Sequence, residues 1–412
     1  MNENGRQNWR WTTLSGAVVL LVLFALVAHG ELWEVFGVFH MRIYFADLMA
    51  ILAAGQAHVA GLDVYESNPF DPLGRPHVYG PLWLLSGHLG LTVSDAWWMG
   101  LLLALLFLVM ALRVLAPRSF GASLVVVLVL LSPPLLLGLE RGNNDLVIFL
   151  LLAGAGSAGA SAIRWRQAEE LALLVLAAVL KFYPLVALMS LWSRAGELRR
   201  IFGKAGLAVL IFGGLWWLQR EGFSRGLAIS PRPETVFSYG FSLLFGTWKL
   251  LVMHWELLSA GMVCGGVLVV TLLWRSWVVL WHSLPLWGVT TSWAVAGGAS
   301  WLFCYLVNTN YQYRAVLLLL VLPWWLALGS ETVEHAVARL GRRLCALLVA
   351  ALWIAAPKYW WAEFFQETEF TATPGTPWVV FIFGIEQMLW LALSAAIAVG
   401  LTGWAWRRWR HV

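Results

Sequence analysis

The stretch GLERGNNDLVIFLLL, residues 138–152, sets five polar side chains directly before a long apolar run. Those side chains are Glu140, Arg141, Asn143, Asn144 and Asp145. Each is costly to remove from water, and a helix start explains only one of them, because Asn144 or Asp145 can serve as its N-cap. The stretch therefore predicts a helix that begins in apolar surroundings with a polar site beside it.

The composition predicts an all-α polytopic membrane protein. Of the 412 residues, 60% are hydrophobic and 12% are charged, whereas soluble proteins carry about 25% charged residues. Apolar runs long enough to cross a bilayer recur along the chain, and we expect about 10–13 transmembrane helices. The excess of 27 Lys and Arg over 22 Asp and Glu fits basic loops that fix orientation. No motif indicates a nucleic-acid partner.

Hydropathy outlines the order of the spans. The apolar run from Leu14 to Ala28 resembles a signal peptide, but it is long and more spans follow, so we predict an uncleaved first helix, with cleavage as the alternative. Later spans are expected at roughly 80–92, 96–115, 121–138, 146–162, 168–193, 205–218, 240–274, 277–306, 314–329, 343–357 and 378–402.

The basic residues give the orientation, with one conflict. The Arg-bearing N-terminus and the tail WAWRRWRHV are expected in the cytoplasm. Arg113 and Arg118 also look cytoplasmic, yet two crossings between Tyr79 and Ala116 would put them outside. Either the segment 80–92 does not cross, or the charge rule fails there.

A long loop is expected between the first helix and Tyr79. Residues 42–61 show helical spacing with Asp47 among them and predict an amphipathic helix in the membrane interface. The following residues are rich in Gly and Pro and predict an irregular loop. We expect one membrane-embedded domain, with this loop at 31–79, a module at 80–218 and a second helical half at 219–412.

Two further polar positions interrupt apolar runs. Lys181, in LKFYP, is costly at membrane depth, and Pro184 breaks the helix beside it, so a local cavity is expected. Tyr311 and Arg314 head another apolar run, where an interfacial anchor is the ordinary interpretation. The cations Arg141, Lys181 and Arg314 should face one compartment together with several carboxylates. A lipid phosphate would suit such a site.

Several kinds of site are not indicated. The chain has no P-loop, no G-x-G-x-x-G between strand and helix, and neither GxSxG nor HExxH. Cys264, Cys304 and Cys345 lie in apolar segments without zinc spacing and are expected to be packing residues. We predict no cofactor, and the sequence supports no metal site, although it leaves a divalent metal open.

The order of motifs resembles the GT-C superfamily of integral-membrane glycosyltransferases, which use polyprenyl-phosphate-linked sugars. The motifs are FADL, GLDVY, HVYGPLWLL, ERGNNDLVIFLLL and LKFYPLVAL, and they cover roughly the first half of the chain. Within the superfamily the chain is similar to the bacterial polyprenol-phosphate-mannose-dependent alpha-mannosyltransferases. It is also similar to the transferase that adds the first mannose to glycosylphosphatidylinositol anchors.

The resemblance implies roles for particular residues. Asp47 takes the place of the catalytic carboxylate, and Phe45 stands where some members carry the first Asp of a D-x-D, which weakens any argument for a metal. The substrate-binding residues that we infer from the motifs and from position are Tyr65, His77, Tyr79, Arg141, Asn144, Asp145, Lys181, Tyr183, Tyr311 and Arg314. Among these, Tyr65 and Tyr79 would shape the acceptor side and Lys181 would approach the donor phosphate.

The expected reaction transfers a hexose, with mannose favoured, from a polyprenyl phosphate to a lipid or glycan acceptor, with inversion and with Asp47 as base. The expected place is the extracytoplasmic side of a bacterial inner membrane, among membrane lipids. A lipid-linked-sugar flippase or other transporter, an inactive subunit of the same fold and a protein O-glycosyltransferase stay open as alternatives. A flippase would not need Asp47 in a long external loop and often shows repeat symmetry.

Overall fold

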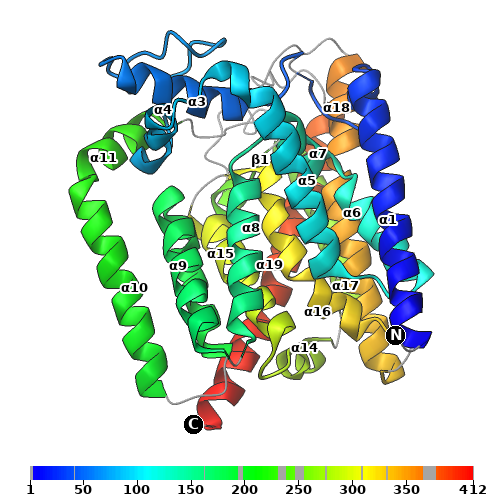
Figure 1. Cartoon of the computed structure of the whole chain (residues 1–412). Coiled ribbons are helices and arrows are strands. Elements are labelled where there is room, and N and C mark those ends of the chain that lie inside the picture. The colour runs from blue at the N-terminus through cyan, green and yellow to red at the C-terminus, as the bar shows by residue number, and fades with distance from the viewer. Residues whose placement is uncertain are drawn as a thin grey trace.

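The computed structural model describes residues 3–40, 42–161, 163–193, 198–230, 238–245, 255–273, 276–307, 310–330, 333–364 and 377–411. Over these ranges helices and their connections make up the chain, together with one short antiparallel ribbon in which β1 (Ser238–Tyr239) pairs with β2 (Asn310–Tyr311). The prediction of an all-α protein is confirmed (Figure 1).

The helices fall into two halves along the chain. The first half holds α1 (Glu3–Ala28), α2 (Leu32–Val35), α3 (Ala46–Val59), η1 (Pro81–Leu84), α4 (Leu85–His88), η2 (Val93–Asp95), α5 (Ala96–Leu115), α6 (Phe120–Leu130), α7 (Pro133–Arg141), α8 (Asp145–Gly159), α9 (Arg164–Leu180), η3 (Tyr183–Ser193) and α10 (Leu198–Leu218). The second half holds α11 (Arg220–Ile229), η4 (Phe241–Phe245), α13 (Trp255–Leu273), α14 (Trp277–Ser283), α15 (Val289–Val307), η5 (Gln312–Leu320), α16 (Leu322–Leu328), α17 (His335–Trp353), α18 (Ala355–Phe364) and α19 (Pro377–Arg410).

Six helical segments of the described chain are long and apolar enough to cross a membrane, which makes the protein a polytopic membrane protein. A seventh arises if α6 and α7, bent by 52°, form one broken span. Other passes through the bundle use shorter pieces, such as α8 and η3. A 3₁₀ helix rises about 2.0 Å per residue, so the 11 residues of η3 cover roughly 22 Å.

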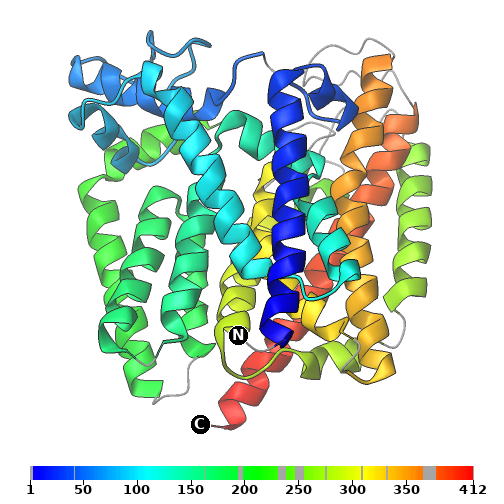
Figure 2. The same ribbon diagram turned by 45° about the vertical axis from the view of Figure 1, so that its right-hand side comes forward.

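The two ends of the bundle differ. The chain termini lie at one end, here named the terminal end, whereas α3, α4 and α11 lie at the other, here named the loop end (Figures 1 and 2). Helix α5 leads from the loop end toward the terminal end. Helix α3 lies across the loop end rather than along the bundle, and most of its residues are buried.

The span expected at 80–92 is wrong. These residues form η1 and α4, each four residues long and too short to cross a bilayer. They pack on α3 at a close approach of two glycines, because a Cβ on Gly87 would lie 1.9 Å from the carbonyl oxygen of Gly55. Between Tyr79 and Ala116 the chain therefore crosses once, through α5, and this removes the conflict over Arg113 and Arg118.

The span expected at 168–193 is broken in the middle. Helix α9 ends at Leu180, Lys181 has an extended backbone, and η3 begins at Tyr183. Pro184 lacks a backbone N–H, and in a continuous α-helix its ring would clash with the carbonyl group of Leu180, four residues before it, so the helix breaks between them. The break places the ammonium group of Lys181 among the polar residues of the loop end.

Candidate functional site

The turn between α7 and α8 explains why the stretch ERGNND has its particular sequence. Gly142 adopts a left-handed conformation at φ 57° and ends α7, as glycine commonly does. The N–H of Gly142 donates to Leu139 and the N–H of Asn143 donates to Gly138, which together satisfy two carbonyl groups at the helix end. The chain then turns directly into α8 and brings Asn143 toward α3.

Asn143 joins two parts of the site. Its Nδ2 donates to Oδ2 of Asp47 at 2.6 Å, and its Oδ1 accepts from the backbone N–H of Asp145 at 2.9 Å. Asn143, rather than the expected Asn144 or Asp145, supplies the side chain that caps the start of α8. One buried amide therefore fixes the position of the Asp47 carboxylate relative to the helix that carries Asp145.

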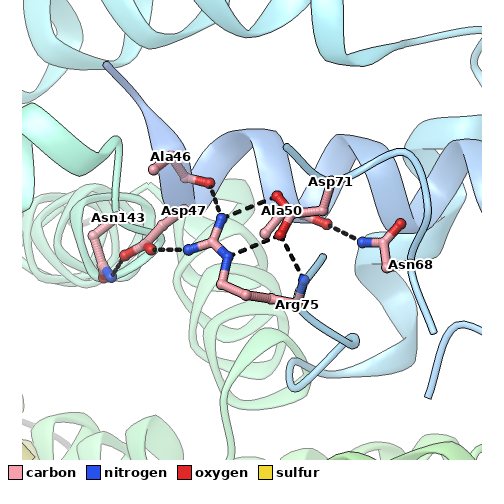
Figure 3. A network of polar contacts seen from close by, with 7 residues as sticks. All are labelled: Ala46, Asp47, Ala50, Asn68, Asp71, Arg75 and Asn143. Atoms are coloured by element: carbon pink, nitrogen blue, oxygen red, sulfur yellow. Dashed lines mark hydrogen bonds and ion pairs between the residues drawn. The ribbon is translucent and has the colours of Figure 1, made fainter. Parts of the chain in front are cut away.

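Arg75 holds the other oxygen of Asp47. Its guanidinium donates to Asp47 Oδ1 at 3.3 Å, to both carboxylate oxygens of Asp71, and to the carbonyl oxygen of Ala46 at 2.6 Å (Figure 3). Asp71 is buried and lies four residues before Arg75. The guanidinium thus bridges two carboxylates, and this pairing ties the irregular loop to the first turn of α3.

Phe45, two residues before Asp47, has a structural role at the start of α3. It precedes α3 with a left-handed backbone (φ 59°), which costs about 1–2 kcal/mol for a residue with a side chain. Its N–H donates to the carbonyl oxygen of Glu140 at 2.7 Å, and its ring packs so closely against α5 that a Cβ on Gly100 would lie 2.3 Å from it. Phe45 therefore anchors α3 on its neighbours and directs Asp47 toward Asn143.

A second cluster surrounds Asp145 at the start of α8. Its Oδ1 accepts from Lys181 Nζ at 2.5 Å and from the hydroxyl of Tyr183 at 2.7 Å, and its Oδ2 lies 3.6 Å from Nε of Arg314. The guanidinium of Arg314 also lies 5.3 Å from the centre of the Tyr183 ring. Three chain segments far apart in sequence therefore meet around one buried carboxylate, which faces two cations.

Tyr79, His77 and Tyr65 form a row of rings on the loop. The centre of the His77 ring lies 5.9 Å from that of Tyr79 and 5.8 Å from that of Tyr65. Lys181 Nζ lies 5.9 Å from the centre of the Tyr79 ring, so the row begins at the cation cluster. Burial and the nearby Asp47 raise the pKa of the Tyr79 hydroxyl, which stays protonated at neutral pH.

The outer part of this row is shaped by burial and by α11. Burial lowers the pKa of His77 to about 4, so its imidazole is neutral at pH 7. A Cβ on Gly222 would lie 2.6 Å from the hydroxyl oxygen of Tyr65, and Arg225 of α11 pairs with Asp63 at 2.7 Å. Tyr65 is therefore packed against α11, at a distance from Asp47 along the row.

The structure brings together most of the residues that the sequence predicted. Tyr311 lies within electrostatic reach of Arg141 and Asp47, and its ring stacks on Tyr313 at 5.5 Å. Asn144 is buried, and within the described ranges its amide makes no hydrogen bond. Sequence reasoning missed Asn143, Arg75 and Asp71 as members of the site. For Asn143 the signal was present, because it lies within ERGNND.

Among the described residues, no group of three or more His, Cys, Asp or Glu side chains could hold a metal ion. Cys304 and Cys345 are buried, as expected for packing residues, whereas Cys264 is exposed on α13.

Comparisons with known proteins give little beyond a general shape. No family model and no curated protein matches the chain. Among solved structures, the chain is similar to ArnT from Cupriavidus metallidurans bound to undecaprenyl phosphate, with a TM-score of 0.42 and 14% identity, over 94% of this chain and 78% of that chain. A likeness at this level does not assign the chain to a family.

The site itself defines what chemistry it can support. A buried carboxylate, Asp47, lies one amide group away from a cluster with two cations, and a protonated tyrosine lies beside both. A carboxylate can accept a proton, and cations stabilise an anionic leaving group. The combination therefore suits the transfer of a group away from an anion such as a phosphate.

Proposed function

We propose that the protein is an integral-membrane glycosyltransferase that transfers a hexose from a polyprenyl phosphate to a hydroxyl group of a lipid or glycan acceptor. In this proposal Asp47 is the base, and Lys181 and Arg314, with Arg141 nearby, receive the donor phosphate. The motifs FADL, HVYGPLW, ERGNND and LKFYP support this assignment through their resemblance to the GT-C superfamily.

The observation that carries the proposal is the double role of Asn143. Its amide binds Asp47 on one side and the start of α8, with Asp145 and its cations, on the other. A base and a phosphate-binding cluster held this close can act on the two sides of one glycosidic carbon. Pre-set geometry of this kind removes much of the entropic cost of bringing donor and acceptor together.

The mechanism follows from these positions. The acceptor oxygen attacks the anomeric carbon, the bond from that carbon to the phosphate oxygen breaks, and the polyprenyl phosphate leaves with the electron pair. The acceptor proton passes to Asp47. Lys181 and Arg314 stabilise the negative charge that grows on the phosphate, at a site where little water competes for it.

A single base and one direct displacement give inversion at the anomeric carbon. A beta-linked donor would then yield an alpha product. We propose mannose as the sugar, because the motif order is most similar to polyprenol-phosphate-mannose-dependent enzymes. The loop end would face the extracytoplasmic side of a bacterial inner membrane, because the basic tail and the N-terminus share the other end.

A transfer assay with the purified protein in lipid tests this function. The donors are a panel of radiolabelled polyprenyl-phosphate sugars, and the acceptors come from a membrane-lipid extract. Asp47→Asn should lower the transfer rate by about 10²–10⁴-fold, the usual contribution of a general base, with little change in thermal stability. The amide oxygen of Asn can still accept from Asn143, so the local fold should persist.

Asp63→Asn is the matched control, because it makes the same change in an exposed ion pair of the same loop. It should leave the rate nearly unchanged, since exposed pairs contribute little. Full activity of Asp47→Asn would remove the carboxylate from the mechanism. Donor binding by the parent protein without transfer of any sugar would favour a carrier or an inactive subunit instead.

A further inference from the structure

We propose that Gln312 and Glu386 are positioning residues, which aim Arg314 at the donor phosphate through a buried contact between η5 and α19. This inference rests on the proposed function. Neither residue lies in a motif of the first half of the chain. Their role follows from how the segment that carries Arg314 is held.

The contact joins Gln312, the first residue of η5, to Glu386 in the first third of α19. Gln312 Nε2 donates to Glu386 Oε1 at 2.6 Å, and the indole N–H of Trp390 donates to the same oxygen at 3.2 Å. Glu386 Oε2 pairs with Lys358 of α18. The side chains of Lys358 and Glu386 are fully buried, and Gln312 is 4% exposed, so this carboxylate is sealed from water.

The next residue of α19 holds the neighbouring strand. Gln387 Nε2 donates to the carbonyl oxygen of Ser238 at 3.3 Å, and Ser238 pairs with Tyr311 in the ribbon. Helix α19 therefore holds β1 through Gln387, and it holds Gln312, the residue directly after β2, through Glu386. Helix α19 runs from the loop end to the terminal end and gives the ribbon a long, fixed support (Figure 1).

Arg314 follows Gln312 by two residues, at the point where the fastened segment reaches the cation cluster. Its guanidinium donates to Oδ1 of Asn310, whose Nδ2 donates to the carbonyl oxygen of Cys304 at 2.5 Å. On the other side it lies 3.6 Å from Asp145. A shift of η5 along α19 would move the guanidinium relative to Asp145 and Lys181, while the cations themselves would remain.

A role limited to packing would not need this chemistry. Two apolar residues of similar volume would fill the same space, and replacing a buried ion pair in this way is often neutral or stabilising. A charged carboxylate accepts a shorter and more directional bond than a neutral group, so it fixes the register of Gln312 on α19. The buried ion pair of Lys358 and Glu386 is thus linked, through Gln312, to the position of the Arg314 guanidinium.

A double-mutant cycle on the donor KM is the central test. Gln312→Leu alone should raise the donor KM by about ten-fold, the effect of one lost hydrogen bond to a charged group. In an Arg314→Leu background the same change should raise it less than about two-fold, because a residue that acts only through Arg314 has nothing left to position. Equal effects in both backgrounds would overturn the proposal.

Two variants guard against a general loss of structure. Gln167→Leu removes a glutamine that binds Lys204 near the terminal end, and it should leave the donor KM unchanged. The pair Lys358→Met with Glu386→Gln removes both charges but keeps an oxygen for Gln312, so the weaker neutral bond should raise the donor KM by about three-fold, less than Gln312→Leu does. A ten-fold rise in KM in either variant would count against positioning by this contact.

Hydrogen exchange separates this inference from the proposed function, because it needs no activity. Gln312→Leu should speed amide exchange in peptides that cover residues 310–314 by about ten-fold, and by more than in peptides from the rest of the bundle. If the parent protein transfers no sugar, the proposed function fails, yet faster exchange would still support the fastening of this segment. Unchanged exchange would overturn it.

Discussion

Two buried pairs of a lysine and a carboxylate lie in the same helical bundle, and they differ in what surrounds them. Lys181 and Asp145 meet Tyr183 and Arg314, and the Lys181 side chain keeps 11% of its surface exposed. Lys358 and Glu386 meet neutral donors, and both side chains are fully buried. The first pair can exchange a partner for an incoming anion, whereas the second can only hold its neighbours in place.

The difference follows from the count of charges. Asp145 is shared by two cations, Lys181 and Arg314. The cluster around Asp145 therefore carries an excess of positive charge, which an anion could neutralise. Glu386 pairs with Lys358 and takes its further hydrogen bonds from neutral groups, Gln312 and Trp390. A buried pair is weak support for stability by itself, but breaking it is costly. Under the proposed function, the same chemistry would serve substrate binding in one place and structural support in the other.

The largest effect is expected where the sealed pair is broken. Lys358→Met removes the cation that neutralises Glu386, so the free energy of unfolding should fall by about 3–5 kcal/mol. Thermal unfolding in detergent measures this change. Lys181→Met is the comparison, and it should destabilise much less because Arg314 still faces Asp145. Equal destabilisation by the two variants would contradict the distinction between the pairs.

The opposite order is expected for donor affinity. Lys181→Met should raise the donor KM by about ten- to hundred-fold, because charge-assisted bonds to a phosphate contribute about 1.5–3 kcal/mol. Steady-state kinetics with varied donor concentration measures it. Lys204→Met, a lysine on α10 far from the loop end, is the control and should leave the KM unchanged. A normal donor KM in Lys181→Met would remove this lysine from the donor site.

A smaller effect concerns the loop that bears the aromatic row. The pKa of His77 is about 4 in the folded protein and about 6.5 in the unfolded chain, because burial disfavours the charged imidazole. Between these two pH values the unfolded state binds more protons than the folded state. The free energy of unfolding therefore decreases as the pH is lowered. Between pH 7 and pH 5 the loss should reach about 2 kcal/mol.

His77→Phe keeps the ring but removes this titration. The melting temperature of the parent should therefore drop more than that of the variant when the pH changes from 7 to 5. Identical shifts would mean that His77 is already charged, or exposed, in the folded protein.

The outcome of individual predictions shows what sequence patterns report. Lys181 beside Pro184 correctly indicated a broken helix, because proline acts on its own backbone and needs no tertiary partner. Asp145 and Lys181 were singled out because charged residues in apolar surroundings are costly and therefore conspicuous, whereas Asp47 was singled out by its place in the motif order. Residues 80–92 were misjudged, because their hydropathy does not reveal that Gly55 and Gly87 let two short helices pack across the loop end.

Arg75 and Asp71 are residues whose role no sequence pattern indicated. In the sequence they are two charges on a loop rich in Gly and Pro, where solvation is the ordinary outcome. Only folding brings the guanidinium between Asp71 and Asp47 and gives both buried carboxylates a partner. Gln312 is similar, because its partner Glu386 lies 74 residues away.

The sequence by itself determined a helical membrane protein, the break at Lys181, and the polar residues that had to find partners inside it. Composition and local backbone preference are sufficient for these, since they depend on each residue and its neighbours in the chain. The tertiary structure decided which end of the bundle the Asp47 and Asp145 clusters share, and that Asn143 joins them. Such pairings depend on distances across the fold, and no local pattern encodes them.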